Sequence, residues 1–234
     1  MEGTTSRSER LFPAREFNPT PVYVLGLGAG GSQAALVLGK LGVSNLIGCD
    51  LQKVEEPNVG TSIYGPSHVS WLKTDACTHV VERLTGIAMA TRACDARELT
   101  ELEGVVFVCV DDMDVRKEII LGQCVPRRGE PQRVMRVIEG RMSAETITVH
   151  SFDPGHEPHV DEWLRYWFPQ SEALPALAGC GAEPVAADYT AGIAARIMGA
   201  MFVQWFAFEQ GRVSSAHNQV RYDLTRFVGE GHVW

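Results

Sequence analysis

Apolar residues in the first half of the chain alternate between short continuous runs and helical spacing. The runs "VYVLGLG", "SNLIGCD" and "GVVFVCVDD" have the unbroken apolar character of buried parallel strands. Between the first two runs, Ala34, Ala35, Leu38 and Leu41 recur with the period of one helix face. A helix is also expected in "HVSWLKTDACTHVVERLTG", ended by Gly86, and a third strand in "IAMATRACD". Strands that alternate with helices predict a parallel sheet with right-handed crossovers.

The pattern changes in the second half. "RVMRVIEGRMSAETITVHSFDP" alternates as antiparallel or edge strands do, whereas "DEWLRYWFPQSEALPALAGCGAEPVA" predicts irregular structure. "DYTAGIAARIMGAMFVQWFAFEQG" predicts a long apolar helix that stops at Gly211, followed by a last strand or hairpin. The aromatic residues of "WLRYWF" and "FVQWFAF" are expected in core or dimer packing. The expected fold is therefore α/β, with a Rossmann-like, mainly parallel sheet flanked by helices and an antiparallel extension in the second half.

Length and charge limit the possible classes of protein. The 234 residues fit one domain, which we place at 21–234, preceded by an N-terminal arm at 1–20 without regular structure. The net charge of −8 argues against nucleic-acid or anionic-membrane partners, which usually need a basic face. We find no signal-peptide pattern and no apolar run that approaches membrane-spanning length, so a soluble, cytoplasmic protein is expected.

Metal-binding patterns are weak. The cysteines are Cys49, Cys77, Cys94, Cys109, Cys124 and Cys180. They form no CxxC pair, which argues against a four-cysteine zinc site, and this usage suits a reducing compartment. Cys49 and Cys109 lie in apolar runs and are expected to be buried strand thiols. The histidines of "HSFDPGHEPH" lie in a short acidic loop that is not expected to bind metal.

A glycine fingerprint joins the first strand to the first helix. Gly26, Gly28 and Gly31 form GxGxxG, and Gly30 lies beside them. Such glycines permit a tight turn and let the backbone approach a phosphate at the helix N-terminus. Asp50 ends the second strand, where a carboxylate can accept hydrogen bonds from ribose hydroxyls. These residues predict a nucleotide site without choosing between NAD and ATP.

Two later stretches favour ATP. These are "CDLQKVEEPNVGTS" followed by "WLKTDA", and "VCVDDMDVR". In them the chain resembles the ubiquitin-activating-enzyme superfamily, specifically its small MoeB/ThiF/HesA-type adenylyltransferases. The residues that match the family pattern, in order, are Asp50, Val54, Glu55, Asn58, Lys73, Asp111 and Arg116. The resemblance extends to "CGAEPVAADYTAGIAARIMGAMFVQWF", where Cys180 aligns with a cysteine of the family's crossover loop.

The resemblance implies an activity and a set of ligands. It implies an ATP-dependent adenylyltransferase that activates the C-terminal carboxylate of a ubiquitin-like or sulfur-carrier protein ending in Gly-Gly, and that works as a homodimer. ATP and Mg²⁺ would be the cofactors, since the charge on three phosphates must be neutralised. Asp111 would hold Mg²⁺, and Lys73 and Asn58 would bind phosphate oxygens. Asp50 would hold the ribose, and in some relatives the counterpart of Cys180 takes the acyl group from AMP.

One position departs from the family pattern. Thr61 stands where an arginine is common, and threonine cannot supply the charge that clamps a phosphate. Arg7, Arg10 and Arg15 are candidates to reach in from a partner's N-terminal arm. The alternatives are a non-catalytic nucleotide-binding scaffold of the same fold and an NAD-dependent oxidoreductase. "EGRMSAE" is expected to be a solvated turn, with Arg141 facing the cleft as the alternative.

Overall fold

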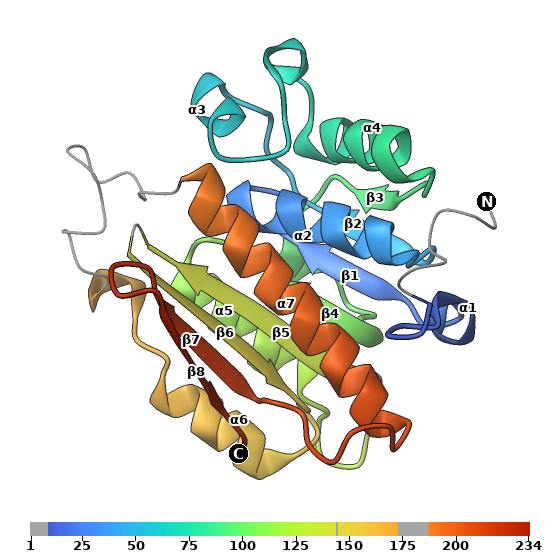
Figure 1. Ribbon diagram of the computed structural model, residues 1–234, viewed down its shortest axis with the longest axis vertical. Helices are drawn as coiled ribbons and strands as arrows, with labels where there is room; N and C mark the ends of the chain where they lie inside the picture. Colours follow the sequence, from blue (N-terminus) through green and yellow to red (C-terminus); the bar gives the residue numbers. More distant parts are fainter. Residues whose placement is uncertain (1–8, 144, 173–186) are drawn as a thin grey trace.

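The computed structural model describes residues 9–143, 145–172 and 187–234. One eight-stranded sheet crosses the molecule in the order β3-β2-β1-β4-β5-β6-β7-β8 (Figure 1). The strands are β1 (Val22–Leu25), β2 (Leu46–Cys49), β3 (Ala90–Arg92), β4 (Gly104–Val108), β5 (Val134–Met142), β6 (Thr146–Phe152), β7 (Gln219–Asp223) and β8 (Val228–His232). Neighbours from β3 to β5 are parallel and those from β5 to β8 are antiparallel, which confirms the expected α/β sheet with its antiparallel extension.

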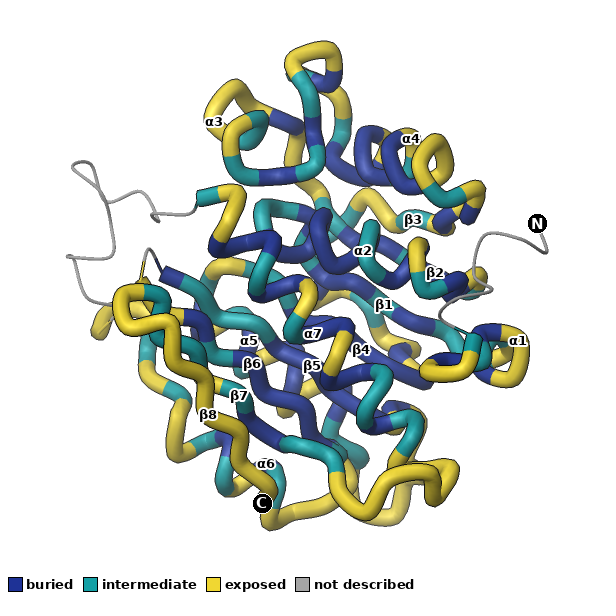
Figure 2. Tube along the Cα trace, in the orientation of Figure 1, coloured by how far each residue is buried: buried dark blue, intermediate teal, exposed yellow. Residues whose placement is uncertain are grey.

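Helices cover both faces of this sheet. They are α1 (Ala14–Phe17), α2 (Ala29–Leu41), α3 (Glu56–Val59), α4 (Lys73–Thr85), α5 (Met113–Ile119), α6 (Glu157–Arg165) and α7 (Asp188–Glu209). Because side chains alternate along a strand, β1 sends Val22 and Val24 into the apolar cluster shared with α2, α4 and α7. Leu25 enters the second cluster, which is shared with α5 and α6. The central strands are buried while β8 is exposed along its length (Figure 2).

Glycines let α2 and α7 pack closely on the sheet and on each other. A Cβ on Gly199 of α7 would come 2.6 Å from Val37 of α2, and one on Gly140 of β5 would come 2.8 Å from Met198 of α7. Both distances are too short for a carbon contact, so these glycines set how near the three elements lie. The glycine loop at the start of α2 is thereby held against the carboxyl end of β5.

Three expectations about local structure are wrong. Residues 1–20 are not a structureless arm throughout, because α1 forms and Phe12 and Phe17 are buried against Phe202 and Phe206 of α7. The segment expected to be irregular after Asp161 begins inside α6, whose Val160 and Trp163 pack on the sheet. Two buried side chains three residues apart are too short a pattern to be distinguished from scattered aromatics in the sequence.

The third wrong expectation concerns the length of apolar runs, because α7 does reach membrane-spanning length. It has 22 residues, its most apolar window has a mean hydropathy of 1.4, and half of that window is buried. Its buried alanines and glycines lie against β5, β6 and α2, so its place across the sheet explains the apolar character of the buried half of this window (Figure 1). The expectation that no apolar run approaches that length is corrected accordingly.

Candidate functional site

The ends of three parallel strands meet at one edge of the sheet. In register, Leu25 of β1 lies between Cys49 of β2 and Val108 of β4. Gly26 N–H donates to the Cys49 carbonyl at 2.8 Å, and Cys109 N–H donates to the Leu25 carbonyl at 2.8 Å. The chain leaves β1 through α2 towards β2, while β4 lies on the other side of β1. This is the topological switch point at which open α/β sheets bind ligands.

The four glycines after β1 lack a side chain for different physical reasons. Gly26 has a φ of +86°, and a Cβ there would stand 2.8 Å from Val110 N. A Cβ on Gly31 would collide with the Gly26 carbonyl oxygen, and one on Gly30 would lie 3.1 Å from Met142 Cε. Gly28 caps the N-terminus of α2, and among the described residues no atom lies within 4 Å of where its Cβ would be. Gly28 therefore faces the open space in front of the helix N-terminus, where a phosphate would bind.

Alanine at Gly28 and at Gly31 should separate binding from folding. Gly28→Ala should lower the free energy of unfolding by about 1 kcal/mol at most, the cost of a poorer N-cap, and weaken ATP binding about tenfold by placing a methyl group in the phosphate space. Gly31→Ala should destabilise the fold by about 3 kcal/mol or more, because backbone must move. Chemical denaturation and ATP titration measure the two effects.

Gly122→Ala is the matched control, since Gly122 also has open space around its Cβ and lies outside the glycine loop. Unchanged ATP affinity in Gly28→Ala would mean that the phosphates do not approach α2 here.

Asp50 joins the glycine loop to the end of β2. Its Oδ2 accepts from Leu27 N–H at 2.8 Å, and its Oδ1 accepts from Gln52 N–H at 2.8 Å. Each carboxylate oxygen can still accept a second hydrogen bond. The acid is thus fixed in orientation beside the glycine loop, as the predicted contact to a ribose requires.

A buried tyrosine fastens the start of α4 to the same loop. Tyr64 Oη donates to the Leu27 carbonyl at 2.6 Å and lies 3.3 Å from the Lys73 carbonyl. Burial raises the Tyr64 pKa, so the phenol stays protonated and keeps this hydrogen bond. Tyr64, which is absent from the predicted site, is the residue that brings Lys73 towards the glycine loop. No motif in the sequence points to it.

Lys73 begins α4 and is 7% exposed. Its Nζ donates to the neutral Gln52 Oε1 at 2.7 Å, and no carboxylate pairs with it among the described residues. A buried ammonium usually has an anionic partner. A phosphate beside this amine would supply the missing negative charge.

Asn58 has a local role in the structure. Its Oδ1 accepts from Glu55 N–H at 2.9 Å and completes a capping box on α3, and its carbonyl accepts from Ser62 Oγ at 2.6 Å. Only the side-chain NH₂ is left to donate to a phosphate. Thr61 lies in the next turn, where its N–H donates to the Asn58 carbonyl at 3.2 Å. Within the described residues, α3 therefore brings no arginine to the site.

Two adjacent acids follow β4, and the structure gives them separate tasks. Asp112 caps α5, with its Oδ1 accepting from Asp114 N–H at 2.8 Å and from Val115 N–H at 2.9 Å. Asp111 is exposed, and among the described residues its carboxylate makes no hydrogen bond or ion pair. Mg²⁺ is commonly held by one or two carboxylates together with substrate phosphates, and Asp111 fits that requirement.

Behind this edge lies a buried charge cluster that the sequence did not indicate. Glu139 of β5 is fully buried. Its Oε1 accepts from Arg116 Nη1 and Arg141 Nε, both at 2.7 Å, while its Oε2 accepts from Trp163 Nε1 at 3.1 Å and is 2.9 Å from His150 Nδ1. "EGRMSAE" is thus not the expected solvated turn, because its first half is strand β5. Arg141 is tied to Glu139 instead of reaching freely into the cleft.

The cluster fixes the protonation states of its members. Burial by itself would raise the Glu139 pKa, but the Arg141 and Arg116 charges and the His150 hydrogen bond outweigh it and hold this pKa well below its usual range. Burial lowers the pKa of His150, so the imidazole is neutral at pH 7. Arg116 therefore anchors α5, the helix that follows Asp111, to β5.

Other predicted residues lie elsewhere. Cys180 and Arg7 lie outside the described residues. Arg15 lies in α1 and Arg10 lies just before it, and both are exposed. Helix α1 lies near the amino end of β1 and away from the glycine loop (Figure 1). Across the described part of the chain, no group of three or more His, Cys, Asp or Glu side chains is arranged to hold a metal.

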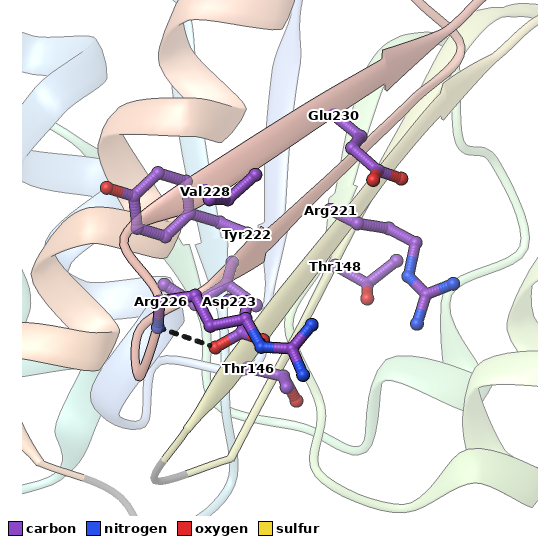
Figure 3. A pocket seen from close by; sticks show the side chains of 9 residues that line it. Thr146, Thr148, Arg221, Tyr222, Asp223, Arg226, Val228 and Glu230 are labelled. Carbon is purple, nitrogen blue, oxygen red and sulfur yellow. Dashed lines mark hydrogen bonds and ion pairs between the residues drawn. The ribbon is translucent and has the colours of Figure 1, made fainter.

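A surface hollow lies away from the predicted nucleotide site. It has a volume of about 330 Å³ and lies on β6, β7 and β8, where Thr148, Arg221, Arg226 and Glu230 line it (Figure 3). None of its lining residues belongs to the glycine loop or to the ends of β1, β2 and β4. The open helix N-terminus, Asp50 and Lys73 instead converge at the switch point, where the sequence predicts a nucleotide.

Comparisons with known proteins agree on the fold. No protein-family model and no curated protein matches the chain. Among solved structures, Escherichia coli MccB with ATP superposes with a TM-score of 0.70 at 12% identity, covering 98% of this chain and 71% of MccB. The chain shares the fold of MccB. The structure of PaaA gives 0.67 at 15% identity, with 98% and 68% covered. MccB with AMPCPP and MccA gives 0.66 at 12% identity, with 95% and 66% covered, so this chain spans about two thirds of that protein.

Proposed function

We propose that this protein is an ATP-dependent adenylyltransferase of the ubiquitin-activating-enzyme superfamily. The observation that carries the proposal is a buried Lys73 that has no anionic partner among the described residues, placed with Asp50 and with Asp111, whose carboxylate is unpaired within the same ranges, around an open helix N-terminus. A site for NAD would use the glycines and Asp50, but it would not require Lys73 or Asp111. One solved structure of MccB holds ATP, and another holds AMPCPP together with MccA, which supports ATP and a peptide or protein acceptor.

The finer proposal concerns the acceptor and the reaction. We propose that the C-terminal carboxylate of a ubiquitin-like or sulfur-carrier protein attacks the α-phosphate of ATP and that pyrophosphate leaves. The backbone N–H groups at the start of α2 and the Lys73 ammonium would hold phosphate oxygens, and Asp50 the ribose. Asp111 would hold Mg²⁺, which neutralises phosphate charge when bound. We also propose that the protein is cytoplasmic and that neither nucleic acid nor a membrane is among its partners.

ATP with Mg²⁺ should raise the melting temperature more than NAD does. A ligand that binds only the native state stabilises it by RT ln(1 + [L]/Kd), about 2.7 kcal/mol at a hundredfold excess over Kd. Differential scanning fluorimetry with equal concentrations of the two nucleotides measures the difference. If NAD stabilises the protein more than ATP does, the NAD-dependent oxidoreductase becomes the better proposal and the adenylyltransferase is rejected.

Thr61 favours the second candidate, a nucleotide-binding scaffold without catalysis. An assay of ATP–pyrophosphate exchange in the presence of a small protein ending in Gly-Gly distinguishes the enzyme from the scaffold, because only the enzyme catalyses this exchange. If the protein is active, the missing cation must come from elsewhere. We propose that two copies pair and that Arg7, Arg10 or Arg15 of one arm reaches the phosphates of the other copy.

The outer face of α7 supports pairing. Ile193, Ile197 and Val203 are only partly buried and Ala200 is exposed, which leaves an apolar stripe along the helix. Ala200→Glu should therefore turn a dimer into a monomer in sedimentation velocity while leaving the fold of each copy intact, since the side chain faces solvent. Leu84→Glu is the control, because Leu84 is an exposed apolar residue on α4. A wild-type protein that sediments as a monomer at all concentrations would rule out the pairing.

A further inference from the structure

Two thiols meet directly beside the candidate nucleotide site. Cys49 Sγ lies 3.7 Å from Cys94 Sγ and donates to the Cys94 carbonyl at 3.3 Å. Cys49 is fully buried at the end of β2, whereas Cys94 is partly exposed just after β3. Among the described cysteines, no other pair has its sulfurs in contact.

We propose that Cys49 and Cys94 are a redox-sensitive pair that a hydroperoxide joins in a disulfide, and that this bond disturbs the contact between Asp50 and the glycine loop. The movement of Asp50 does not depend on which nucleotide binds.

Exposure assigns the two sulfurs different parts in the reaction. Burial and the contact with Cys94 raise the pKa of the Cys49 thiol to about 12, so this thiol stays protonated and out of reach. Cys94 reacts first: its sulfur attacks one oxygen of the hydroperoxide, the O–O bond breaks, and the other oxygen leaves with the thiol proton, giving a sulfenic acid and water, or an alcohol from an alkyl hydroperoxide. The Cys49 sulfur then displaces hydroxide from the Cys94 sulfur, and with the thiol proton this leaves as water. Two electrons pass from the sulfurs to the peroxide.

The bond requires movement next to the site. A disulfide brings the sulfurs to about 2.05 Å, so they must approach by roughly 1.7 Å. Cys49 is held by strands on both sides, with its carbonyl accepting from Gly26 N–H at 2.8 Å. Cys94 lies in a short connection between Arg92, whose carbonyl accepts from Asp50 N–H at 3.3 Å, and Asp95, which caps the next turn. The connection is therefore the part that moves, and Arg92 passes the movement to Asp50.

The test uses the full chain treated with hydrogen peroxide and then with dithiothreitol. Mass spectrometry of the digested protein should show a Cys49–Cys94 cross-linked peptide that lacks two hydrogen atoms and is lost on reduction. Without nucleotide, amide hydrogen exchange at Leu27 and Gln52, the two donors to Asp50, should become at least about fivefold faster in the oxidised protein. ATP affinity should fall in parallel and recover with dithiothreitol.

Variants show whether the pair is responsible. Cys94→Ala should abolish the cross-link and the change in exchange, while Cys124→Ala, which removes a buried thiol without a sulfur neighbour, should keep both. Absence of the cross-link, or a cross-link that leaves exchange at Leu27 and Gln52 unchanged, overturns the proposal. A reduced protein that binds no ATP would overturn the proposed function instead, since cross-linking and exchange are read without nucleotide.

Discussion

Asp111→Asn is expected to lower the rate of acceptor-dependent ATP–pyrophosphate exchange by about a hundredfold or more while leaving the fold intact. The substitution keeps the shape of the side chain but removes the negative charge that would hold Mg²⁺. Since the Asp111 carboxylate has no hydrogen bond or ion pair among the described residues, the fold loses nothing when its charge is removed. The same variant should lose the dependence of ATP affinity on Mg²⁺, which isothermal titration calorimetry measures without any acceptor.

The adjacent acid provides the control. Asp112→Asn removes an equal charge one residue away, and asparagine caps a helix as well as aspartate does. It should therefore keep both stability and Mg²⁺ dependence. If the two variants behave alike, the charge at the end of β4 acts at long range and Asp111 is not a metal ligand.

Glu139→Gln is expected to lower the free energy of unfolding by about 3–5 kcal/mol. The wild-type carboxylate is fully buried and accepts from two guanidinium groups at 2.7 Å. Glutamine leaves both positive charges buried without an anion, and Arg116 Nε and Arg141 Nη2 already lack partners among the described residues. Urea denaturation measures the loss. Glu118→Gln, which removes an ion pair to the exposed Arg97 at 3.5 Å, should leave the free energy of unfolding almost unchanged.

The same cluster predicts the direction of acid sensitivity. The folded pKa of Glu139 lies below its unfolded value, so its contribution is fully present above that unfolded value and is lost as the pH falls through the folded pKa. The folded pKa of His150 is also lowered, so the unfolded chain binds a proton there first, and stability falls as the pH drops below about 6.5. Stability should thus decline from about pH 6.5 downward, and Glu139→Gln should flatten the part of the decline below pH 5. An identical acid profile in the variant would mean that other carboxylates control it.

Much of the site could be predicted because its parts are local in sequence. The positions of Gly26, Gly28 and Gly31 follow from one strand–turn–helix unit, and Asp50 and Asp111 follow directly from apolar runs that end in acids. In a parallel sheet the carboxyl ends of such runs share one edge, so their proximity follows from the pattern. The family resemblance identified Lys73 by its place in the order of matching residues. It did not predict that Lys73 is buried or that its amine contacts the neutral side chain of Gln52.

Residues that depend on distant partners were not predicted. The fold places Glu139 among residues of α5, β6 and α6, and Tyr64 between the glycine loop and α4, but the sequence near each shows only an ordinary acid or aromatic residue. Phe12 looked like part of an exposed arm until it was placed against α7, which lies nearly two hundred residues away in sequence.

The sequence by itself therefore determined the α/β class, the switch-point loop and the acids at the strand ends, because each is encoded by the periodicity and turn chemistry of a short segment. The tertiary structure alone decided which charges are buried, which acid caps a helix and which stays open, and which two cysteines touch. Those properties depend on the neighbours that each side chain meets once the strands pair and the helices pack, and no local pattern records them.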